Sequence, residues 1–474
     1  MNILYINWVP SRFFHTKGGG VSIYQKNLID SAINKGHKVT YLTAGYIYSP
    51  ISPGVKIRHV KSPLFERLDE YEIINSEVMA PSFYSFDEVN KYFSENKSRD
   101  VFFDFLRKKG GFDVIHFNNM EGFPATWLDA KHEWPNTKFV LSLHNYFPFC
   151  AQVNLWHKDR ENCIDFADGK KCLDCNIFKV NTSVIKIEIM IEDLLGDRPI
   201  THKLKRLIYP TKKIMHKIIS RNDISRNGDV LLPDHRIRRE KFVHYINNSF
   251  DSVLAVSERV KQIAVNMGVN SDICQVSYIG TKHADKMNDN YKVCQKNKGH
   301  LTVAYLGYMR FDKGFYFLLD TLEKMPQSLA KNISFILAAP ITDPQSYDRL
   351  MNMKSKFYSI VIYDGYSQSD ISEILRPVDL GLVPVMWEDN LPQITYEFVS
   401  NGVPVLASNL GGASELSSSN DFMFKAGDSD SFINKIEALL NSDVSLQDYW
   451  KHFHRDRVKT MDAHVNELIS NYYS

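Results

Sequence analysis

Short apolar runs alternate with segments of helical periodicity along the first part of the chain. An apolar run at 2–7 is followed by a glycine triplet, a helical pattern over 21–34 and a second apolar run over 38–43. This order predicts a βαβ unit with a glycine-rich turn after its first strand. Further apolar runs at 113–117 and 138–144 extend the predicted parallel sheet.

A second series of strands and helices follows a glycine-containing linker at 280–300. Its predicted strands are 301–306, 333–338, 359–363, 380–384 and 403–407. Two α/β halves in tandem predict two doubly wound domains that face each other across a cleft. Because ligands bind outside the carboxyl ends of parallel strands, we expect the ligand in this cleft.

These patterns predict the organisation of the whole chain. We expect an N-terminal domain over 1–285, a C-terminal domain over 286–444 and a terminal helix over 445–474 that crosses back to the N-terminal domain. Residues 150–250 interrupt the α/β rhythm with a cysteine-containing segment and then basic, helical sequence. This segment is typical of an insertion.

The composition is that of a globular protein. The 474 residues are 44% apolar and 24% charged, which excludes a mainly disordered chain. The 57 basic residues nearly balance the 55 acidic ones, so no overall field favours nucleic acid as a partner. No apolar run reaches the roughly 18 residues of a membrane span, and the first residues do not resemble an export signal. We therefore expect a cytoplasmic protein.

One stretch, 203–241, is strongly basic, with 12 Lys or Arg against four acidic residues. Leucines and isoleucines interleave with these cations at helical spacing, which suits binding to an anionic membrane surface. The alternative is the solvated, charged face of an insertion helix. The first interpretation predicts peripheral attachment to the membrane.

Four of the six cysteines, Cys150, Cys163, Cys172 and Cys175, fall within 26 residues. Cys172 and Cys175 have the spacing of a chelating pair, and four thiolates would complete a closed, structural zinc site. His157 is a possible substitute ligand. Unligated buried thiols and disulfides are the competing interpretations.

Asp389 and Glu397 lie eight positions apart, on either side of a predicted helix start near Pro392. The free N–H groups of a helix N-terminus bind phosphate, and carboxylates accept hydrogen bonds from sugar or ribose hydroxyls. The combination predicts a site for a nucleotide sugar. The alternative is that Asp389 caps the helix and Glu397 is a solvated helix residue.

Other candidates also follow predicted strands. Arg310 and Lys313 come after the strand at 301–306, where their charges can reach the cleft; solvated loop cations are the alternative. His144 ends the predicted strand at 138–144. A histidine at a strand end commonly does no more than satisfy the hydrogen bonds of backbone groups. Gly18–Gly20 permits a close approach of the backbone to a ligand, or is a plain flexible loop.

The segment from Asp389 to Glu397 resembles the acidic-x7-acidic motif of the retaining glycosyltransferases of family 4. That family has the GT-B fold, in which two Rossmann-like domains face each other. Further matching segments occur in the family's order and span nearly the whole chain: Gly18–Gly20, Lys35–Val39, Leu254–Glu258, Gly307 with Lys313–Gly314, and Asn401–Val405. Asp389 departs from the family, where Glu is commoner, and Tyr308 stands where many relatives have Arg.

The resemblance implies a role for each candidate residue. Glu397 would bind the ribose of a UDP- or GDP-sugar, and Asp389 the hydroxyls of the transferred sugar. Lys313 and Arg310 would stabilise the leaving diphosphate without a catalytic metal. The other implied contacts are the main-chain N–H groups of Asn390 and Leu391, His144 beside the sugar, and Gly18, Gly19 and Gly20 beside the diphosphate or the acceptor.

The implied activity is the anomer-retaining transfer of a sugar to a glycan or lipid-linked acceptor, as in O-antigen, capsule or exopolysaccharide synthesis. Such an enzyme would work in the cytoplasm or at the inner face of the membrane. A GT-B epimerase would share the donor contacts but would need acid/base carboxylates and no acceptor. A non-catalytic nucleotide-sugar-binding protein would keep the fold without turnover.

Overall fold

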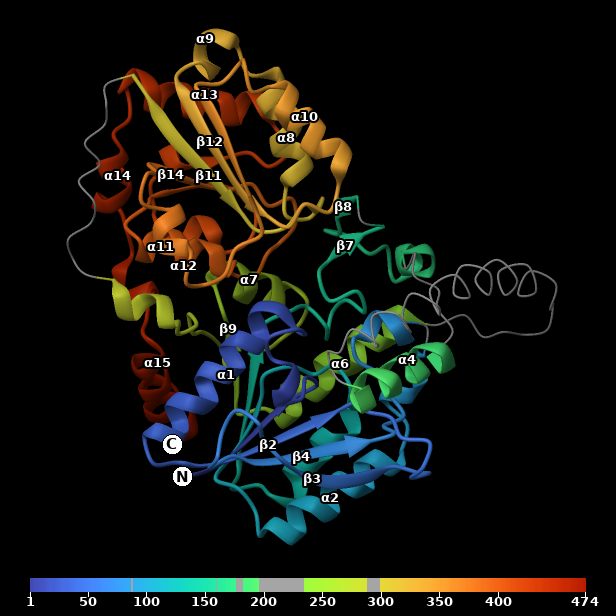
Figure 1. Cartoon of the computed structure of the whole chain (residues 1–474). Coiled ribbons are helices and arrows are strands. Elements are labelled where there is room, and N and C mark those ends of the chain that lie inside the picture. The colour runs from blue at the N-terminus through green and yellow to red at the C-terminus, as the bar shows by residue number, and fades with distance from the viewer. Residues whose placement is uncertain (87, 159, 176–181, 196–233, 288–298) are drawn as a thin grey trace, which may run out of the picture.

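The computed structural model describes residues 1–86, 88–158, 160–175, 182–195, 234–287 and 299–474. Figure 1 shows two α/β domains, the N-terminal one in the lower half of the view and the C-terminal one above it. Each domain is built around one sheet whose neighbouring strands are mostly parallel. This arrangement confirms the predicted fold class of two facing, Rossmann-like domains.

The described strands of the N-terminal domain form an eight-stranded sheet in the order β10-β9-β6-β5-β1-β2-β4-β3, in which only β3 is antiparallel to its neighbour. The strands are β1 (Asn2–Asn7), β2 (Lys38–Ala44), β3 (Lys56–Lys61), β4 (Asp69–Ile74), β5 (Val114–Phe117), β6 (Lys138–Leu143), β9 (Ser252–Ala255) and β10 (Cys274–Val276). The helices are α1 (Gly19–Asn34), α2 (Lys97–Lys109), α3 (Ala130–Glu133), α4 (Thr182–Leu195), α6 (His235–Ser249) and α7 (Glu258–Asn266).

The described strands of the C-terminal domain form a six-stranded parallel sheet in the order β13-β12-β11-β14-β15-β16. The strands are β11 (Leu301–Leu306), β12 (Ile333–Ala339), β13 (Ser359–Asp364), β14 (Leu380–Val383), β15 (Val405–Ser408) and β16 (Met423–Phe424). The helices are α8 (Phe315–Lys324), α9 (Gln327–Ala330), α10 (Pro344–Asn352), α11 (Ile371–Ile374), α12 (Gln393–Ser400) and α13 (Ser429–Asn441).

The strand order of the second sheet reverses next to β11. From β11 the chain adds β12 and β13 on one side, then returns to pair β14 with the other side of β11. The loops that follow β11 and β14 diverge at such a reversal and leave a crevice outside the strand ends. The ligand side of the C-terminal domain is therefore at these loops.

The central strands are apolar on both faces. All seven residues of β12 are buried, as are residues 3–7 of β1. Strands of a parallel sheet have this pattern when helices cover both faces of the sheet. The continuous apolar runs in the sequence therefore mark the strands that build the two cores.

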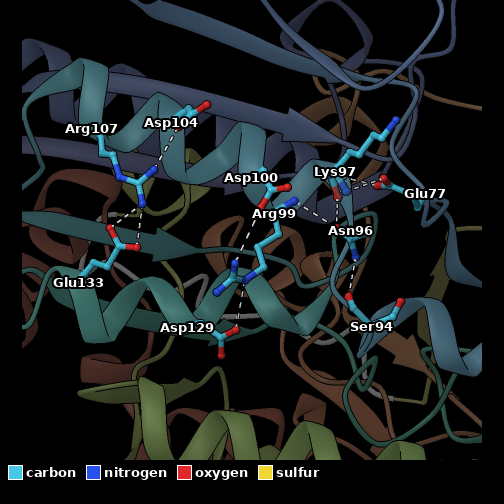
Figure 2. Close-up of polar contacts among 11 residues, drawn as sticks. Glu77, Ser94, Asn96, Lys97, Arg99, Asp100, Asp104, Arg107, Asp129 and Glu133 are labelled. Atoms are coloured by element: carbon cyan, nitrogen blue, oxygen red, sulfur yellow. Dashed lines mark hydrogen bonds and ion pairs between the residues drawn. The ribbon is translucent and has the colours of Figure 1, made fainter.

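Polar contacts hold α2 against the rest of the N-terminal domain (Figure 2). Asn96 caps the helix by accepting a hydrogen bond from the Arg99 backbone N–H at 3.1 Å. Arg99 Nε lies 3.3 Å from Asp129, and Arg107 forms two hydrogen bonds of 2.9 and 3.0 Å with Glu133. Such exposed ion pairs are screened by water, so each contributes little to stability. In Figure 1, α2 lies at the foot of the domain, remote from the C-terminal domain.

Residues 445–474 do not form the single helix that the sequence analysis predicts. They form α14 (Leu446–Lys451) and α15 (Met461–Leu468), because Ser445 and Thr460 each cap a new helix start. The helix α15 lies beside α1 near the two chain ends in Figure 1. Tyr24 OH and His464 Nε2 are 2.8 Å apart, and His116 Nδ1 and Tyr473 OH are 2.5 Å apart, so the last residues contact the N-terminal domain.

The insertion contributes a small hairpin, β7 (Trp156–His157) with β8 (Glu161–Asn162), and the helices α4 and α6. Most of the basic stretch lies outside the described residues. In its described end, Arg238 is buried and donates to the Phe147 carbonyl oxygen at 2.8 Å, so this cation serves an internal contact. No helix within the described ranges is both long and apolar enough to cross a membrane.

Candidate functional site

A cavity of about 650 Å³ lies between the two domains. We call it the donor cavity, after the function that we propose below. The N-terminal domain lines it with the loop before α1 and with His144. The C-terminal domain lines it with residues that follow β11, β13 and β14 and with the start of α12. These are carboxyl ends of parallel strands at the reversal of strand order, which is the expected place for a ligand.

Glu397 lies in the second turn of α12 and is only 7% exposed. The Tyr366 hydroxyl donates to its Oε2 at 3.4 Å, and His283 Nε2 lies 3.7 Å from its Oε1. Burial raises the pKa of the Glu397 carboxyl to about 7. Because the side chain lines the donor cavity, its oxygens can accept hydrogen bonds from the hydroxyls of a ligand.

Lys313 and Asp389 form an ion pair in the donor cavity. Lys313 Nζ donates to Asp389 Oδ2 at 2.6 Å, and the ammonium lies 5.2 Å from the centre of the Trp387 ring. Asp389 is buried, whereas about a quarter of the Lys313 side chain is exposed. A pair in such a setting is screened less by water than a surface pair. The ion pair therefore fixes a cation and a carboxylate side by side.

Two glycines allow the loops around this pair to come close together. A Cβ atom at Gly314, where φ is +75°, would lie 1.6 Å from the Pro384 carbonyl oxygen. A Cβ atom at Gly411, where φ is +67°, would lie 2.1 Å from the Asp389 carbonyl oxygen. Both φ values belong to the left-handed region that favours glycine. A larger residue at either position would displace the loop that carries Lys313 or Asp389.

The glycine triplet lies at the start of α1. Gly18 is the N-cap residue, with φ +72°, and Gly19 and Gly20 line the donor cavity. Gln393, the first residue of α12, donates from Nε2 to the Gly20 carbonyl oxygen at 2.9 Å. The starts of α1 and α12 therefore meet at the same cavity. Their unpaired N–H groups and the positive ends of their dipoles favour an anionic ligand.

His144 follows β6 and packs on Tyr24, with ring centroids 4.5 Å apart. Burial lowers the pKa of His144 to about 3, so its ring is neutral at physiological pH. Its Nε2 has no hydrogen-bond partner among the described residues, and the side chain lines the donor cavity. His144 therefore stands in the wall of the donor cavity without a positive charge, and its Nε2 is buried.

The structure brings most of the predicted site residues together. Asn390 and Leu391 line the donor cavity with Lys313, Asp389 and Glu397.

Arg310 and Gly18 do not line the donor cavity. They line a larger neighbouring cavity. Arg310 donates from Nε and Nη2 to Asp312, both at 2.9 Å. Of the two predicted cations, Lys313 is the one that lines the donor cavity.

Contacts that the sequence analysis did not single out join the domains beside the cavity. Arg259 makes a bidentate ion pair with Glu388, with distances of 2.8 and 2.6 Å. Glu415 accepts a hydrogen bond from the Arg259 backbone N–H at 2.7 Å, and Ser257 Oγ donates to the Asn390 carbonyl oxygen at 2.8 Å. Two features of the sequence could have pointed to these contacts. Ser257 lies in the cap position of α7, and Glu388 lies beside the acidic motif. Their partners lie in the opposite domain, so the pairing needs the folded chain.

The four clustered cysteines are free thiols that lie near one another in the insertion. Burial, with a contribution from the neighbouring cysteines, raises the pKa of Cys163 to about 11 and that of Cys172 to about 12. Within the described part of the chain, no group of three or more His, Cys, Asp or Glu side chains is arranged to hold a metal ion. The structure thus does not form the four-thiolate zinc site, which stays a prediction from the sequence.

Metal analysis of protein purified without chelator tests this prediction. The four-thiolate interpretation predicts about one zinc ion per chain, because a closed structural site holds a single ion. It also predicts that a strong chelator lowers the melting temperature, since metal binding contributes to folding. A zinc content near zero, together with unchanged stability in the chelator, would leave buried thiols as the better interpretation.

The second part of the chain matches a known protein family. Residues 300–442 match the family "Glycosyl transferases group 1". This segment contains the six strands of the second sheet and the three side chains Lys313, Asp389 and Glu397. Among curated proteins, none has a significant sequence match to this chain.

Several solved structures resemble the whole chain at low sequence identity. Anabaena HepE in complex with UDP is 13% identical, covers 99% of this chain and 100% of its own, and has a TM-score of 0.54. Sucrose-phosphate synthase from Thermosynechococcus elongatus is 13% identical, covers 100% of this chain and 98% of its own, and has a TM-score of 0.55.

A third similar structure, described as trehalose-6-phosphate from E. coli bound with UDP-2-fluoro glucose, is 10% identical with a TM-score of 0.54. It covers 100% of this chain and 99% of its own. At such identities the likeness shows the fold. The protein therefore has the GT-B fold, and its residues 300–442 match the family model of the group 1 glycosyl transferases.

Proposed function

We propose that the protein is an anomer-retaining glycosyltransferase of family 4 that uses a nucleotide sugar as donor. The observation that carries this proposal is the convergence of Lys313, Asp389 and Glu397 in one cavity, beside the starts of α1 and α12. A cation and two helix starts suit a diphosphate, and buried carboxylates suit hydroxyl groups. Similar structures hold UDP or UDP-glucose, so UDP-sugars are the first donors to test and GDP-sugars the second.

Each side chain has a distinct part in this proposal. Glu397 accepts hydrogen bonds from the ribose hydroxyls, and Asp389 from a hydroxyl of the transferred sugar. Neutral His144, in the wall of the same cavity, lies beside this sugar. The backbone N–H groups at Gly19, Gly20, Asn390 and Leu391 approach the diphosphate or the sugar; Pro392 has no N–H to offer.

The proposed reaction is a displacement on one face of the donor sugar. The bond between the anomeric carbon and the diphosphate oxygen breaks, and the acceptor oxygen bonds to the same face of that carbon. The acceptor proton passes to the departing phosphate. Lys313 stabilises the charge that develops on the diphosphate. Arg310 is paired with Asp312 and lines the neighbouring cavity, so Lys313 carries this role in the present geometry.

The proposed acceptor is a growing bacterial surface glycan, such as an O-antigen, capsule or exopolysaccharide unit on a lipid carrier. This proposal rests on the family resemblance. The basic composition of the stretch 203–241 supports a site of action at an anionic membrane surface, because segments rich in Lys and Arg bind anionic lipids. On this proposal the enzyme works in the cytoplasm, at the inner face of the membrane.

Nuclear magnetic resonance of the products tests the reaction directly. The protein would be incubated with UDP- and GDP-sugars, with and without a glycan acceptor, and the anomeric signals followed over time. The proposal predicts a new glycosidic linkage with the anomeric configuration of the donor. A linkage of inverted configuration would contradict retention, and an altered donor sugar without transfer would show an epimerase.

The affinity for the donor nucleotide is expected to rise between pH 6 and pH 8. Burial raises the pKa of Glu397 to about 7, so the side chain is largely protonated at pH 6 and largely ionised at pH 8. The ionised form is the better acceptor for ribose hydroxyls. If it alone binds, the dissociation constant of UDP falls by up to about tenfold over this range.

Calorimetric titration of UDP at both pH values measures this change. The Glu397→Gln variant is the control, because it cannot ionise while the phosphates of UDP titrate as before. The contribution of Glu397 is the difference between the wild type and the variant in the pH dependence of the UDP dissociation constant. Equal pH dependence in the wild type and the variant would contradict the assignment of the ribose contact to Glu397.

A further inference from the structure

A second cavity, of about 1210 Å³, adjoins the donor cavity. We call it the outer cavity. Thr16, Lys17 and Val21 line both cavities, so the loop before α1 and the first turn of α1 form their shared wall. The insertion forms much of the outer wall, through residues 152–156 and through α4. Small-molecule sites are usually about 300–1,000 Å³, so the outer cavity has room for the end of a longer glycan.

Aromatic side chains gather in the outer cavity. Trp8 and Tyr46 are neighbours with ring centroids 5.4 Å apart, and Phe83 and Tyr84 are neighbours at 4.4 Å. Trp156, from the hairpin of the insertion, also lines the cavity. Flat, weakly polar ring faces pack against the C–H face of a sugar ring, while the sugar hydroxyls need separate polar partners.

Glu121 supplies such a partner. It is 4% exposed, yet it lines the outer cavity. Its Oε1 accepts from the Ser82 backbone N–H at 2.8 Å, and its Oε2 accepts from Asn119 Nδ2 and Asn145 Nδ2, both at 3.2 Å. A carboxylate has about four acceptor sites. These donors, with a further contribution from the Ser82 side chain, hold Glu121 in place as a hydrogen-bond acceptor in the wall of the outer cavity.

The described lining of the outer cavity is more acidic than basic. Its charged side chains are Glu121, Glu188, Glu192 and Asp312 against Lys17 and Arg310. Both cations are already paired, Lys17 with Glu192 at 3.1 Å and Arg310 with Asp312 at 2.9 Å. A phosphate group here would meet carboxylates without a cation to spare among the described lining residues. The lining therefore favours an uncharged ligand.

We propose that the outer cavity binds the acceptor through an uncharged sugar, which stacks on the aromatic side chains and donates a hydroxyl hydrogen bond to Glu121. This inference rests on the proposed glycosyltransferase function and names the acceptor class for it. Glu121 and the aromatic residues select a neutral sugar and discriminate against a sugar phosphate. The insertion, which supplies Trp156 and α4, is thus the part of the chain that shapes acceptor recognition.

Tryptophan fluorescence tests the proposal, because Trp8 and Trp156 line the outer cavity. The full-length protein, with saturating UDP, is titrated with methyl glycosides of glucose, mannose, galactose and N-acetylglucosamine, and with glucose 6-phosphate and mannose 6-phosphate. At least one methyl glycoside is expected to give a saturable change. Its affinity should exceed that of the 6-phosphates by about tenfold or more, and Glu121→Gln should weaken it by about tenfold, as for a lost hydrogen bond to a charged group.

Variants keep the result unambiguous. Glu133→Gln is the matched control, because Glu133 pairs with Arg107 of α2 (Figure 2) and does not line the outer cavity; it should bind the glycoside like the wild type. Trp156→Phe should reduce the signal and weaken binding even if Glu121→Gln folds poorly. Tighter binding of a 6-phosphate, no saturable signal from any methyl glycoside, or unchanged binding in folded Glu121→Gln would overturn the proposal. Stabilisation by UDP is measured separately, so a failure of nucleotide binding in the wild type counts against the proposed function instead.

Discussion

Replacing Lys313 with alanine is expected to lower kcat by about 10²–10³-fold, the usual effect of removing one group that stabilises developing negative charge. The ammonium of Lys313 lines the donor cavity and lies 2.6 Å from Asp389. In the proposed reaction it is the cation that meets the departing diphosphate. Steady-state rates with a saturating UDP- or GDP-sugar measure the effect, because saturation separates turnover from donor binding.

The control for this experiment is Lys324→Ala, which removes an exposed lysine at the end of α8. Lys313→Ala also leaves the buried Asp389 without its partner, so the melting temperature of each variant has to be recorded. Lys313→Arg keeps the charge and should recover part of the rate. If folded Lys313→Ala turns over at the wild-type rate, the assignment of the diphosphate site is wrong.

Replacing Glu397 with alanine is expected to raise the dissociation constant of the donor nucleotide by about 10- to 100-fold. A hydrogen bond to a charged group contributes about 1.5–3 kcal/mol, which corresponds to this range. The carboxyl group is buried in the wall of the donor cavity, so water compensates poorly for its loss. Calorimetric titration with UDP and GDP measures the change.

Glu437→Gln, at an exposed position of α13, is the matched control and should bind the nucleotide like the wild type. A nucleoside monophosphate that lacks both ribose hydroxyls should bind the wild type and Glu397→Ala with similar, weak affinity. If Glu397→Ala folds and still binds the complete nucleotide like the wild type, the ribose contact lies elsewhere.

The sequence was sufficient to predict the strands that build the cores, because their apolar runs are continuous. It did not predict β4, where Glu70 and Glu72 interrupt the apolar pattern. In the folded chain both carboxylates are buried: Glu70 accepts from the Ser11 backbone N–H at 2.9 Å, and Glu72 pairs with Arg58 at 2.7 Å. These partners lie far away in the sequence or outside the strand. Buried polar residues with distant partners hide a strand from any local pattern.

In the candidate site, too, some residues could be predicted from local sequence pattern and others could not. Lys313, Asp389 and Glu397 could be predicted together because they lie in the loops after β11 and β14 and in the second turn of α12, and these elements follow from local pattern. Arg310 could not be placed, because its pairing with Asp312 depends on loop geometry. The outer cavity was not predictable either. Its lining comes from loops and a helix of the N-terminal domain, the insertion and the loop after β11, and no short motif connects them.

The central claim is that a nucleotide sugar binds between the two domains. Thermal or denaturant unfolding of the wild type and of Glu397→Ala, with and without UDP, GDP and their sugars, tests it most directly. At a concentration of 100 times its dissociation constant, a ligand that binds only the folded state stabilises it by about 2.7 kcal/mol. The account predicts this stabilisation of the wild type by at least one of these ligands, and a much smaller one of Glu397→Ala at the same concentration. Unchanged unfolding of the wild type with every one of these ligands at millimolar concentration would contradict it.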